Sequence, residues 1–222
     1  MLHIRSGLVS TCGREQVQGE DIQRLRPAQW LNDEVINFYG AMITERAARQ
    51  GREQGDPLDV HYFNTFFYEK LVNPGYEKAR LNKWSKKVDI FSKDVILIPI
   101  NLGNSHWTCA CINVRRKRIE YYDSLGTRRE VVYQRLREYL QRESLDKKKI
   151  DFEFEDWEDY FSEATPQQEN AYDCGVFVCQ FMEAISRGED AEEFAFDQRN
   201  MPYIRRRMLW EISEKRLIGW KQ

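Results

Sequence analysis

The stretch that organises this chain is Pro166-Gln167-Gln168-Glu169-Asn170-Ala171-Tyr172-Asp173-Cys174-Gly175, and the apolar residues 176–182 follow it at once. A cysteine that begins a helix has backbone N–H groups and the positive end of the helix dipole directed at its sulfur, and both favour thiolate over thiol. Cys174 is therefore placed as a nucleophile would be. A buried cysteine that only packs against its neighbours fits this stretch equally well, so the rest of the chain must decide.

The length of the chain is typical of one domain with a hydrophobic core. Its 222 residues contain no Pro/Gly/Ser-rich linker and no break in composition. We expect residues 1–20 to form an extended or loosely ordered lead-in and residues 21–222 to form a single domain. The first ten residues lack an apolar signal segment, and the longest apolar run, residues 95–100, is too short to cross a bilayer. These features predict a soluble intracellular domain, which can be part of a longer chain.

Charge and cysteine content narrow the partners and the compartment. The chain has 34 Lys and Arg residues against 36 Asp and Glu, and the net charge of −2 argues against bulk nucleic-acid binding. The five cysteines form an odd set without regular spacing, so free thiols in a reducing compartment are expected instead of a disulfide framework. The acidic cluster at residues 153–159 and the basic runs at residues 115–118 and 205–207 are expected to be solvated turns and helix faces.

Hydrophobic periodicity predicts the helices. Apolar residues recur at helical spacing from about residue 33 to residue 50, where Asn32 or Asp33 can cap the first turn. A short helical turn precedes this helix at residues 21–25. Further helices are predicted near residues 61–73, 129–142, 174–188 and 200–217.

Strand patterns occupy the middle of the chain. Residues 95–100 are continuously apolar, as a strand buried on both faces would be. Residues 107–114 and 118–123 indicate a hairpin, and residues 151–154 alternate like an edge strand. In an antiparallel pair, His106 at the start of one strand and Asp123 at the end of the next lie at the same edge of the sheet. We therefore expect these two side chains to approach each other.

A small group of side chains can supply what nucleophilic catalysis needs. A thiol requires a base that accepts its proton, and an imidazole requires a carboxylate that fixes its tautomer. His106 is the candidate base for Cys174, because a glycine-containing loop precedes it and Asp123 lies at the adjacent strand end. Gln168, six residues before Cys174, can offer its side-chain amide beside the Cys174 backbone N–H as an oxyanion site.

Other chemistries have less support. Cys109 and Cys111 share one face of a predicted strand, but no second cysteine pair or histidine pair accompanies them, so they are interpreted as core thiols and no metal is expected. His61, among aromatic residues, is interpreted as structural, and His3 in the lead-in as incidental. Neither GxGxxG nor GxxxxGK[ST] occurs, which disfavours a nucleotide enzyme.

A set of short motifs resembles a known family. The motifs are Trp30-Leu31-Asn32-Asp33, Phe63-Asn64-Thr65-Phe66-Phe67, Trp84-Ser85-Lys86-Lys87-Val88-Asp89, His106-Trp107, Tyr121-Tyr122-Asp123-Ser124, Pro166-Gln167-Gln168 and Asp173-Cys174-Gly175. In this order they are similar to the catalytic domain of the Ulp/sentrin-specific proteases, the SUMO-cleaving cysteine peptidases, from about residue 21 to residue 217. The resemblance implies an α+β, papain-like cysteine protease fold of the Ulp type, with a central mixed sheet flanked by helices.

The resemblance also implies catalytic roles. Cys174, His106 and Asp123 would form a triad, and Gln168 would help to bind the oxyanion. The residues alone already suggested these roles, and the family resemblance assigns all four to one site.

Further positions match the substrate contacts of that family. Trp30 and Trp107 match tryptophans that flank a tunnel for the diglycine tail of the substrate; such a tunnel admits residues without side chains and rejects others by steric clash. Asp33 matches an acid that pairs with an arginine of SUMO, Phe66 an aromatic contact on the SUMO surface, and Lys83 a basic position facing the modifier. A favourable helix-dipole contact for Asp33 and core packing for Phe66 remain alternative explanations.

The implied function is that of a SUMO-specific thiol isopeptidase and endopeptidase. It would cleave after the C-terminal Gly-Gly of SUMO, in conjugates with lysine and in precursors, through a thioester and without a cofactor. Its expected partners are SUMO and SUMO-conjugated proteins, with no nucleic acid and no membrane. The family suggests a monomer in the nucleus, at the nuclear envelope or in the cytoplasm.

Two alternatives stay open at this point, a relative specific for NEDD8 or ubiquitin and a catalytically silent SUMO-binding module. The Phe-Asn-Thr-Phe-Phe and Lys-Lys-Val-Asp elements favour SUMO. Asn104-Ser105 and Ala171 depart from some relatives beside the groove for the tail. These departures leave the SUMO paralogue, and the balance between maturation and deconjugation, undetermined by the sequence.

Overall fold

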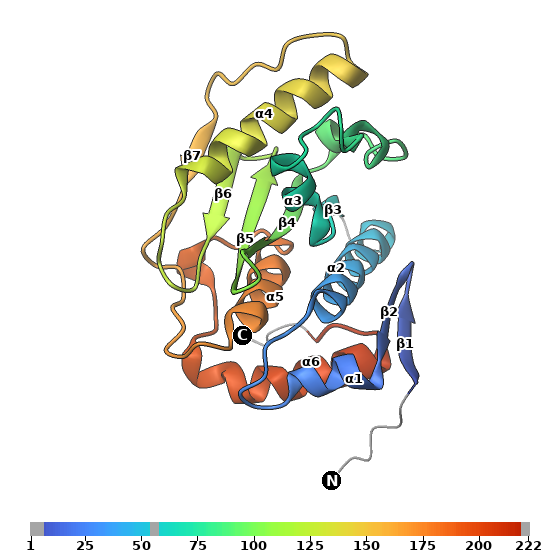
Figure 1. Ribbon diagram of the computed structural model, residues 1–222, viewed down its shortest axis with the longest axis vertical. Coiled ribbons are helices and arrows are strands. Elements are labelled where there is room, and N and C mark those ends of the chain that lie inside the picture. Colours follow the sequence, from blue (N-terminus) through green and yellow to red (C-terminus); the bar gives the residue numbers. More distant parts are fainter. Residues whose placement is uncertain (1–6, 54–57, 219–222) are drawn as a thin grey trace.

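A computed structural model describes residues 7–53 and 58–218 (Figure 1). His3 lies outside the described residues. The helices are α1 (Gly19–Ile22), α2 (Asp33–Glu53), α3 (Phe66–Val72), α4 (Glu130–Lys147), α5 (Cys174–Ile185) and α6 (Met201–Glu214). The strands are β1 (Leu8–Cys12), β2 (Glu15–Gln18), β3 (Val60–Tyr62), β4 (Val95–Leu102), β5 (His106–Asn113), β6 (Arg118–Tyr122) and β7 (Glu158–Tyr160). The predicted α+β class is confirmed.

A central mixed sheet has the strand order β3-β4-β5-β6-β7. β4, β5 and β6 are antiparallel neighbours, whereas the short edge strands run parallel to their partners, β3 to β4 and β7 to β6. β5 and β6 pair with Cys109 opposite Tyr122, so His106 begins β5 near the place where Asp123 leaves β6. The predicted hairpin is confirmed, and it brings these two residues to one edge of the sheet.

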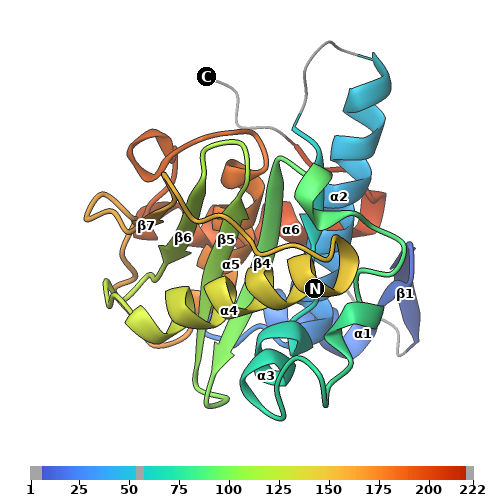
Figure 2. The same cartoon turned by 90° about the horizontal axis from the view of Figure 1, so that it is seen from above.

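Helices cover both faces of the sheet, which gives the molecule three layers (Figure 2). The buried residues form two hydrophobic clusters, one on each face of the sheet, and successive side chains of β4 alternate between them. Val95 and Leu97 join the cluster that includes α2, α5 and α6, whereas Ile96 and Ile98 join the cluster that includes α3 and α4. None of the four is more than 1% exposed, so the predicted strand buried on both faces is confirmed.

Helix α2 begins where the sequence predicts. Asn32 Oδ1 accepts a hydrogen bond from the backbone N–H of Val35 at 3.3 Å, which satisfies one donor of the first turn. Asp33 and Glu34 add negative charge at the positive end of the helix dipole. The side-chain amide of Asn32 also donates to Asp21 Oδ1 at 2.7 Å. The residues that follow Trp30 are therefore tied both to α2 and to the end of α1.

The predicted helix at residues 61–73 is only partly correct. Residues 60–62 form β3, and the helix α3 starts at Phe66. Parallel pairing with β4 decides the structure of this segment, and that contact joins residues far apart in the sequence. His61 is consequently a strand residue, packed edge-to-face against Phe63 with 4.7 Å between ring centroids.

The predicted edge strand at residues 151–154 is wrong, because β7 occupies the edge beside β6. Phe152 and Phe154 instead pack against Trp157, at ring-centroid distances of 5.3 and 6.3 Å. Aromatic packing thus accounts for the alternating pattern that resembled a strand.

Residues 8–18 form an antiparallel hairpin of β1 and β2 beside α2 (Figure 1). Val17 is fully buried, Cys12 is 4% exposed, and the Cys12 thiol donates to Glu45 of α2 at 3.1 Å. The sequence predicts an extended or loosely ordered lead-in. Residues 8–12 and 15–18 are extended, but they are not loosely ordered, because they pack onto α2.

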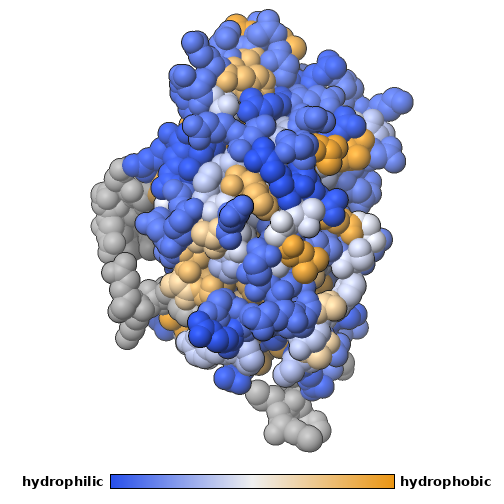
Figure 3. Space-filling model, turned by 90° about the vertical axis from the view of Figure 1, so that its left-hand side faces the viewer, coloured by the Kyte–Doolittle hydropathy of each residue, from blue (hydrophilic) through white to orange (hydrophobic). Residues whose placement is uncertain are grey.

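Hydrophilic side chains predominate on the side of the molecule that carries β7, where hydrophobic residues form small separate patches (Figure 3). Part of the acidic cluster pairs with nearby cations, since Asp159 lies 2.7 Å from Arg137. Among the described residues, no helix is long and apolar enough to span a membrane.

The expectation of a solvated face at residues 205–207 is wrong for two of its three arginines. Arg205 and Arg207 are only 3% and 5% exposed, and Arg206 alone is exposed. α6 turns Arg205 and Arg207 inward against other elements, where acceptors are available to their guanidinium groups.

Candidate active site

Cys174 is the first residue of α5, and its side chain is almost fully buried. Asp173 precedes the helix, and its carbonyl accepts from Val176 N–H at 2.9 Å and Phe177 N–H at 3.0 Å. The first N–H groups of a helix have no intrahelical partner, so they and the positive end of the dipole are available to a negative charge at the sulfur. The predicted helix start at Cys174 is confirmed.

His106 and Asp123 approach each other as the hairpin predicted. His106 Nε2 lies 2.6 Å from Asp123 Oδ1, and the two side chains are 13% and 1% exposed. Asp123 Oδ1 also accepts from the backbone N–H of Leu125 at 2.8 Å, which fixes the carboxylate. Because Nε2 serves the aspartate, Nδ1 is the ring nitrogen that remains for a thiol.

The protonation of His106 depends on both neighbours. Burial alone would lower the pKa of this imidazole, but hydrogen bonds with Asp123 and Cys174, and the negative charge of these groups, raise it from 6.5 to about 9. At neutral pH the ring is therefore a cation beside the cysteine sulfur. Cys174, His106 and Asp123 form one connected group, which can move a proton between the thiol and a leaving group.

Gln168 lies next to this group, on the loop that enters α5. Ser124, directly after Asp123, donates from Oγ to Gln168 Oε1 at 2.6 Å, and Gln168 N–H donates to the Ser124 carbonyl at 2.7 Å. The side-chain amide of Gln168 donates to the carbonyl of Asn170. The loop therefore holds Gln168 beside the Asp123 turn through two hydrogen bonds with Ser124, a residue to which the sequence analysis assigned no role.

The two tryptophans predicted to flank the diglycine tail are both connected to Leu31: Trp30 precedes it in the sequence, and Trp107 binds its carbonyl. Trp107 is 6% exposed, and its indole N–H donates to the Leu31 carbonyl at 3.2 Å, whereas Trp30 is 40% exposed. A Cβ added at Gly175 would lie 2.8 Å from Leu31 Cβ, so the segment that carries Trp30 packs closely against the start of α5. Trp30, Trp107 and Cys174 are thus linked through Leu31.

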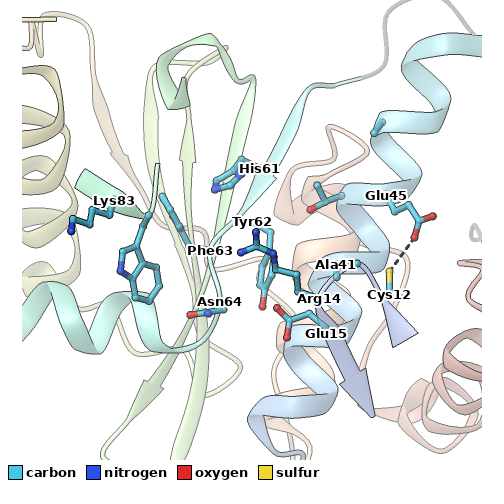
Figure 4. Close-up of a pocket in the computed structure, with 14 residues that line it drawn as sticks. Cys12, Arg14, Glu15, Ala41, Glu45, His61, Tyr62, Phe63, Asn64 and Lys83 are labelled. Carbon is cyan, nitrogen blue, oxygen red and sulfur yellow. Dashed lines mark hydrogen bonds between the residues drawn. The ribbon is translucent and has the colours of Figure 1, made fainter. Parts of the chain in front are cut away.

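The three residues that match contacts with the folded modifier lie on the surface. Asp33 is partly exposed at the first turn of α2, and Phe66 at the start of α3 is 45% exposed, so core packing does not explain Phe66. Lys83 is exposed and lies at one side of a groove of about 750 Å³ between α2, β3 and the β1–β2 hairpin (Figure 4). Cys174 does not line this groove. The groove is therefore a surface feature apart from the catalytic candidates.

The other four cysteines are poor nucleophile candidates. Burial and the hydrogen bond with Glu45 raise the pKa of Cys12 to about 12, and burial raises the pKa of Cys109, Cys111 and Cys179 above the usual range. Cys109 and Cys111 are fully buried on the α5 side of the sheet, as core thiols would be. Over residues 7–53 and 58–218, no cluster of three or more His, Cys, Asp or Glu side chains could hold a metal ion.

The site combines a cysteine at a helix start, an imidazole in contact with it and an aspartate on the other ring nitrogen, beside a mixed sheet. This combination defines a cysteine peptidase as the class of protein. The family model described as "Ulp1 protease family, C-terminal catalytic domain" matches residues 29–217. The chain belongs to this family.

Individual relatives agree with this family. The Sentrin-specific protease of Caenorhabditis elegans is 43% identical over 204 residues, which are 92% of this chain and 28% of that protein. Sentrin-specific protease 2 of Homo sapiens is 37% identical over 213 residues, which are 95% of this chain and 34% of that protein. The chain therefore spans about a third or less of the length of these relatives.

Solved structures show the same fold. The C-terminal Ulp1 protease domain in complex with SMT3, the yeast ortholog of SUMO, superposes with a TM-score of 0.75 and 29% identity, over 95% of this chain and 89% of that chain. A SUMO protease Ulp1 with its catalytic cysteine oxidised to a sulfenic acid gives a TM-score of 0.76 and 28% identity, over 93% of this chain and 88% of that chain. The Ulp-type fold implied by the sequence motifs is confirmed.

Proposed function

We propose that this chain is a SUMO-specific thiol peptidase that cleaves the bond after the C-terminal Gly-Gly of SUMO, both in conjugates with lysine and in precursors. The observation that carries the proposal is His106, bound to Asp123 at 2.6 Å on one side and in contact with Cys174 on the other, in a member of the Ulp1 protease family. The names of its relatives and the SMT3-bound structure support SUMO as the modifier.

The proposed reaction uses only side chains and water. The Cys174 thiolate attacks the carbonyl carbon of the terminal glycine, and the Cys174 N–H and the Gln168 amide stabilise the oxyanion. The Gln168 amide has two N–H donors, so it can keep its bond with the Asn170 carbonyl and offer the second donor to the oxyanion. His106 then protonates the leaving amine, which breaks the C–N bond and leaves a thioester. Water, deprotonated by His106, hydrolyses the thioester, which releases the carboxylate of SUMO and restores the thiolate beside the protonated imidazole.

Specificity in this proposal comes from contacts away from the sulfur. Trp30 and Trp107 would enclose the diglycine tail, and their shared link to Leu31 and α5 supports a fixed distance from the tail to Cys174. The surface positions of Asp33, Phe66 and Lys83 support contacts with the folded modifier. A single domain over residues 21–222, a monomeric state and a nuclear or cytoplasmic location stay predictions from the family resemblance.

The test is a panel of electrophilic probes made from SUMO, NEDD8 and ubiquitin. Only the SUMO probe should label Cys174 rapidly, and Cys174→Ala should abolish cleavage of a SUMO conjugate while binding persists. Cys12→Ala is the matched control, because it removes a buried thiol outside the site and should keep labelling. Faster labelling by a NEDD8 or ubiquitin probe would change the assigned modifier. Absence of labelling by any probe would leave a silent binding module as the better description.

A further inference from the structure

Arg205 of α6 joins three parts of the chain that are far apart in the sequence. Its Nε and Nη2 donate to Asp173 Oδ1 at 2.8 and 2.7 Å. The same guanidinium donates to four backbone carbonyls, those of Arg24 at 3.0 Å, Arg26 at 3.1 Å, Gln29 at 2.8 Å and Tyr172 at 3.1 Å. α6, the segment before Trp30 and the turn before Cys174 therefore meet at one side chain.

This set of bonds requires arginine. A buried cation is tolerated only when a counter-charge and hydrogen-bond acceptors replace its water, and Asp173 and the carbonyls supply both. The guanidinium has a planar fork of donors, whereas a lysine ammonium has a single donor atom and cannot reach separated acceptors together. Arg205→Lys would therefore keep the positive charge but lose most of these hydrogen bonds.

The segments that Arg205 holds are those that carry the reacting sulfur and one wall of the proposed tunnel. Asp173 immediately precedes Cys174, and Asn170 and Gln198 bind its other oxygen at 2.7 and 2.9 Å, so the turn before α5 is fixed from several sides. Gln29 immediately precedes Trp30. One guanidinium thus binds both the residue before the nucleophile and the residue before Trp30.

A second observation concerns the other side of Trp30. The carbonyl of Leu31 accepts from the Trp107 indole, and the Leu31 side chain packs against Gly175. The backbone is therefore anchored directly before Trp30 by Arg205 and directly after it by Trp107, while the Trp30 ring stays 40% exposed. This arrangement fixes the backbone of Trp30 and leaves its ring free to contact a ligand.

We propose that Arg205 is a positioning residue that holds Cys174 and Trp30 in one geometry, so that a tail seated against Trp30 meets the sulfur in line for attack. Arg205 acts through Asp173 and the Gln29 carbonyl and does not itself touch the reacting atoms. The proposal rests on the proposed peptidase function for its substrate, but it makes a separate statement about the reactivity of the Cys174 sulfur.

The chain contains a matched control two residues further along α6. Arg207 is also buried, donates to Gln180 Oε1 at 2.5 Å and lies 3.4 Å from Glu211. These partners lie on α5 and α6, inside the helix layer, and not in the segment before Trp30 or in the turn before Cys174. Arg207→Lys should therefore weaken helix packing in the same way without moving the site.

The experiment compares Arg205→Lys with Arg207→Lys, well below the thermal midpoints of both. With a coumarin amide of SUMO as substrate, Arg205→Lys should lower kcat/KM by about 10- to 100-fold, the order expected for misplaced reacting groups. Arg207→Lys should stay within about threefold of wild type, because Gln180 and Glu211 lie outside the turn before Cys174 and the segment before Trp30. Similar kcat/KM values for the two variants at matched stability would overturn the proposal.

A substrate-free measurement separates this proposal from the proposed function. Alkylation of Cys174 by iodoacetamide should slow about fivefold or more in Arg205→Lys, because the thiolate depends on its placement against His106 and the helix start. The ratio of the alkylation rates of wild type and Arg205→Lys can be measured even if wild type cleaves no SUMO substrate. If Arg205→Lys does not fold, Asp173→Asn tests the same bond from its partner and should also slow alkylation; an unchanged rate in the folded variant overturns the proposal.

Discussion

Replacement of Asp123 by Asn should shift the alkaline limit of activity. The amide oxygen can still accept from His106 and from the Leu125 N–H, so both hydrogen bonds to Oδ1 are kept while the negative charge is lost. The pKa of His106 is raised from 6.5 to about 9 against the effect of burial, and Asp123 is one of the two neighbours that raise it. Without that charge, we expect the pKa of the imidazole to fall by about 1–2 units.

This change has a defined effect on rate. At pH 8 an imidazole with a pKa of about 9 is roughly 90% protonated, whereas one with a pKa of about 7.5 is roughly 25% protonated. The kcat/KM of Asp123→Asn for a coumarin amide of SUMO should therefore begin to fall at a lower pH than that of wild type. The measured limit belongs to the Cys174–His106 pair as a unit. An alkaline limb that stays at about 9 in the variant would refute this explanation of the raised pKa.

The same substitution should change stability in a pH-dependent way. The raised pKa of His106 means that the folded state holds the proton more tightly than the unfolded state does. The resulting stabilisation is fully present below about pH 6.5 and is lost as the pH rises through about 9. In addition, Asp123 Oδ2 is buried and has no hydrogen-bond partner among the described residues, so an Asn amide placed there would cost about 1–3 kcal/mol at any pH. Urea denaturation should therefore show that the difference in the free energy of unfolding between wild type and Asp123→Asn narrows with increasing pH.

Three further substitutions test the surroundings of the site. Phe66→Ala should change the free energy of unfolding by less than about 0.5 kcal/mol, because the ring is 45% exposed, but should raise KM for a SUMO substrate. Its neighbour Phe67 is fully buried, so Phe67→Ala should cost about 3–5 kcal/mol in thermal or urea denaturation; equal costs for both would contradict the assigned exposures. Gly175→Ala should cost about 1–3 kcal/mol and reduce kcat/KM, because its Cβ would lie 2.8 Å from Leu31 Cβ, and a variant as stable and active as wild type would show that this contact is not tight.

Local patterns were sufficient for the elements that carry the triad candidates. The apolar run of β4, the hairpin of β5 and β6 and the start of α5 each have a pattern within a few residues, and the antiparallel hairpin alone predicted that His106 and Asp123 would meet. Residue chemistry predicted Cys174 and Gln168 as their partners, and the family motifs assigned all four residues to one site. The proximity of these four residues in the structure agrees with the predictions. The catalytic roles of Cys174 and Asp123 are tested by the substitutions described above.

The elements that were predicted wrongly depend on contacts between distant residues. β3 is a strand because it pairs with β4, and residues 151–154 are not a strand because β7 takes the place beside β6. The sequence pattern predicts a solvated basic run at Arg205, because its acceptors at Asp173 and Gln29 lie on other segments. A charged residue at an inward helical position next to Ile204 and Met208 was the available signal, but its partners could not be named from the sequence.

The division of the interior by the sheet has a consequence for the evolution and engineering of this chain. Cys174 and Trp107 belong to the cluster on the α2, α5 and α6 side, and the cluster beneath α3 and α4 contains neither. Substitutions in that second cluster can adjust thermal tolerance while the reacting groups keep their spacing. Repacking beneath α4 is therefore the expected route to thermostable versions of the protein that keep the site intact.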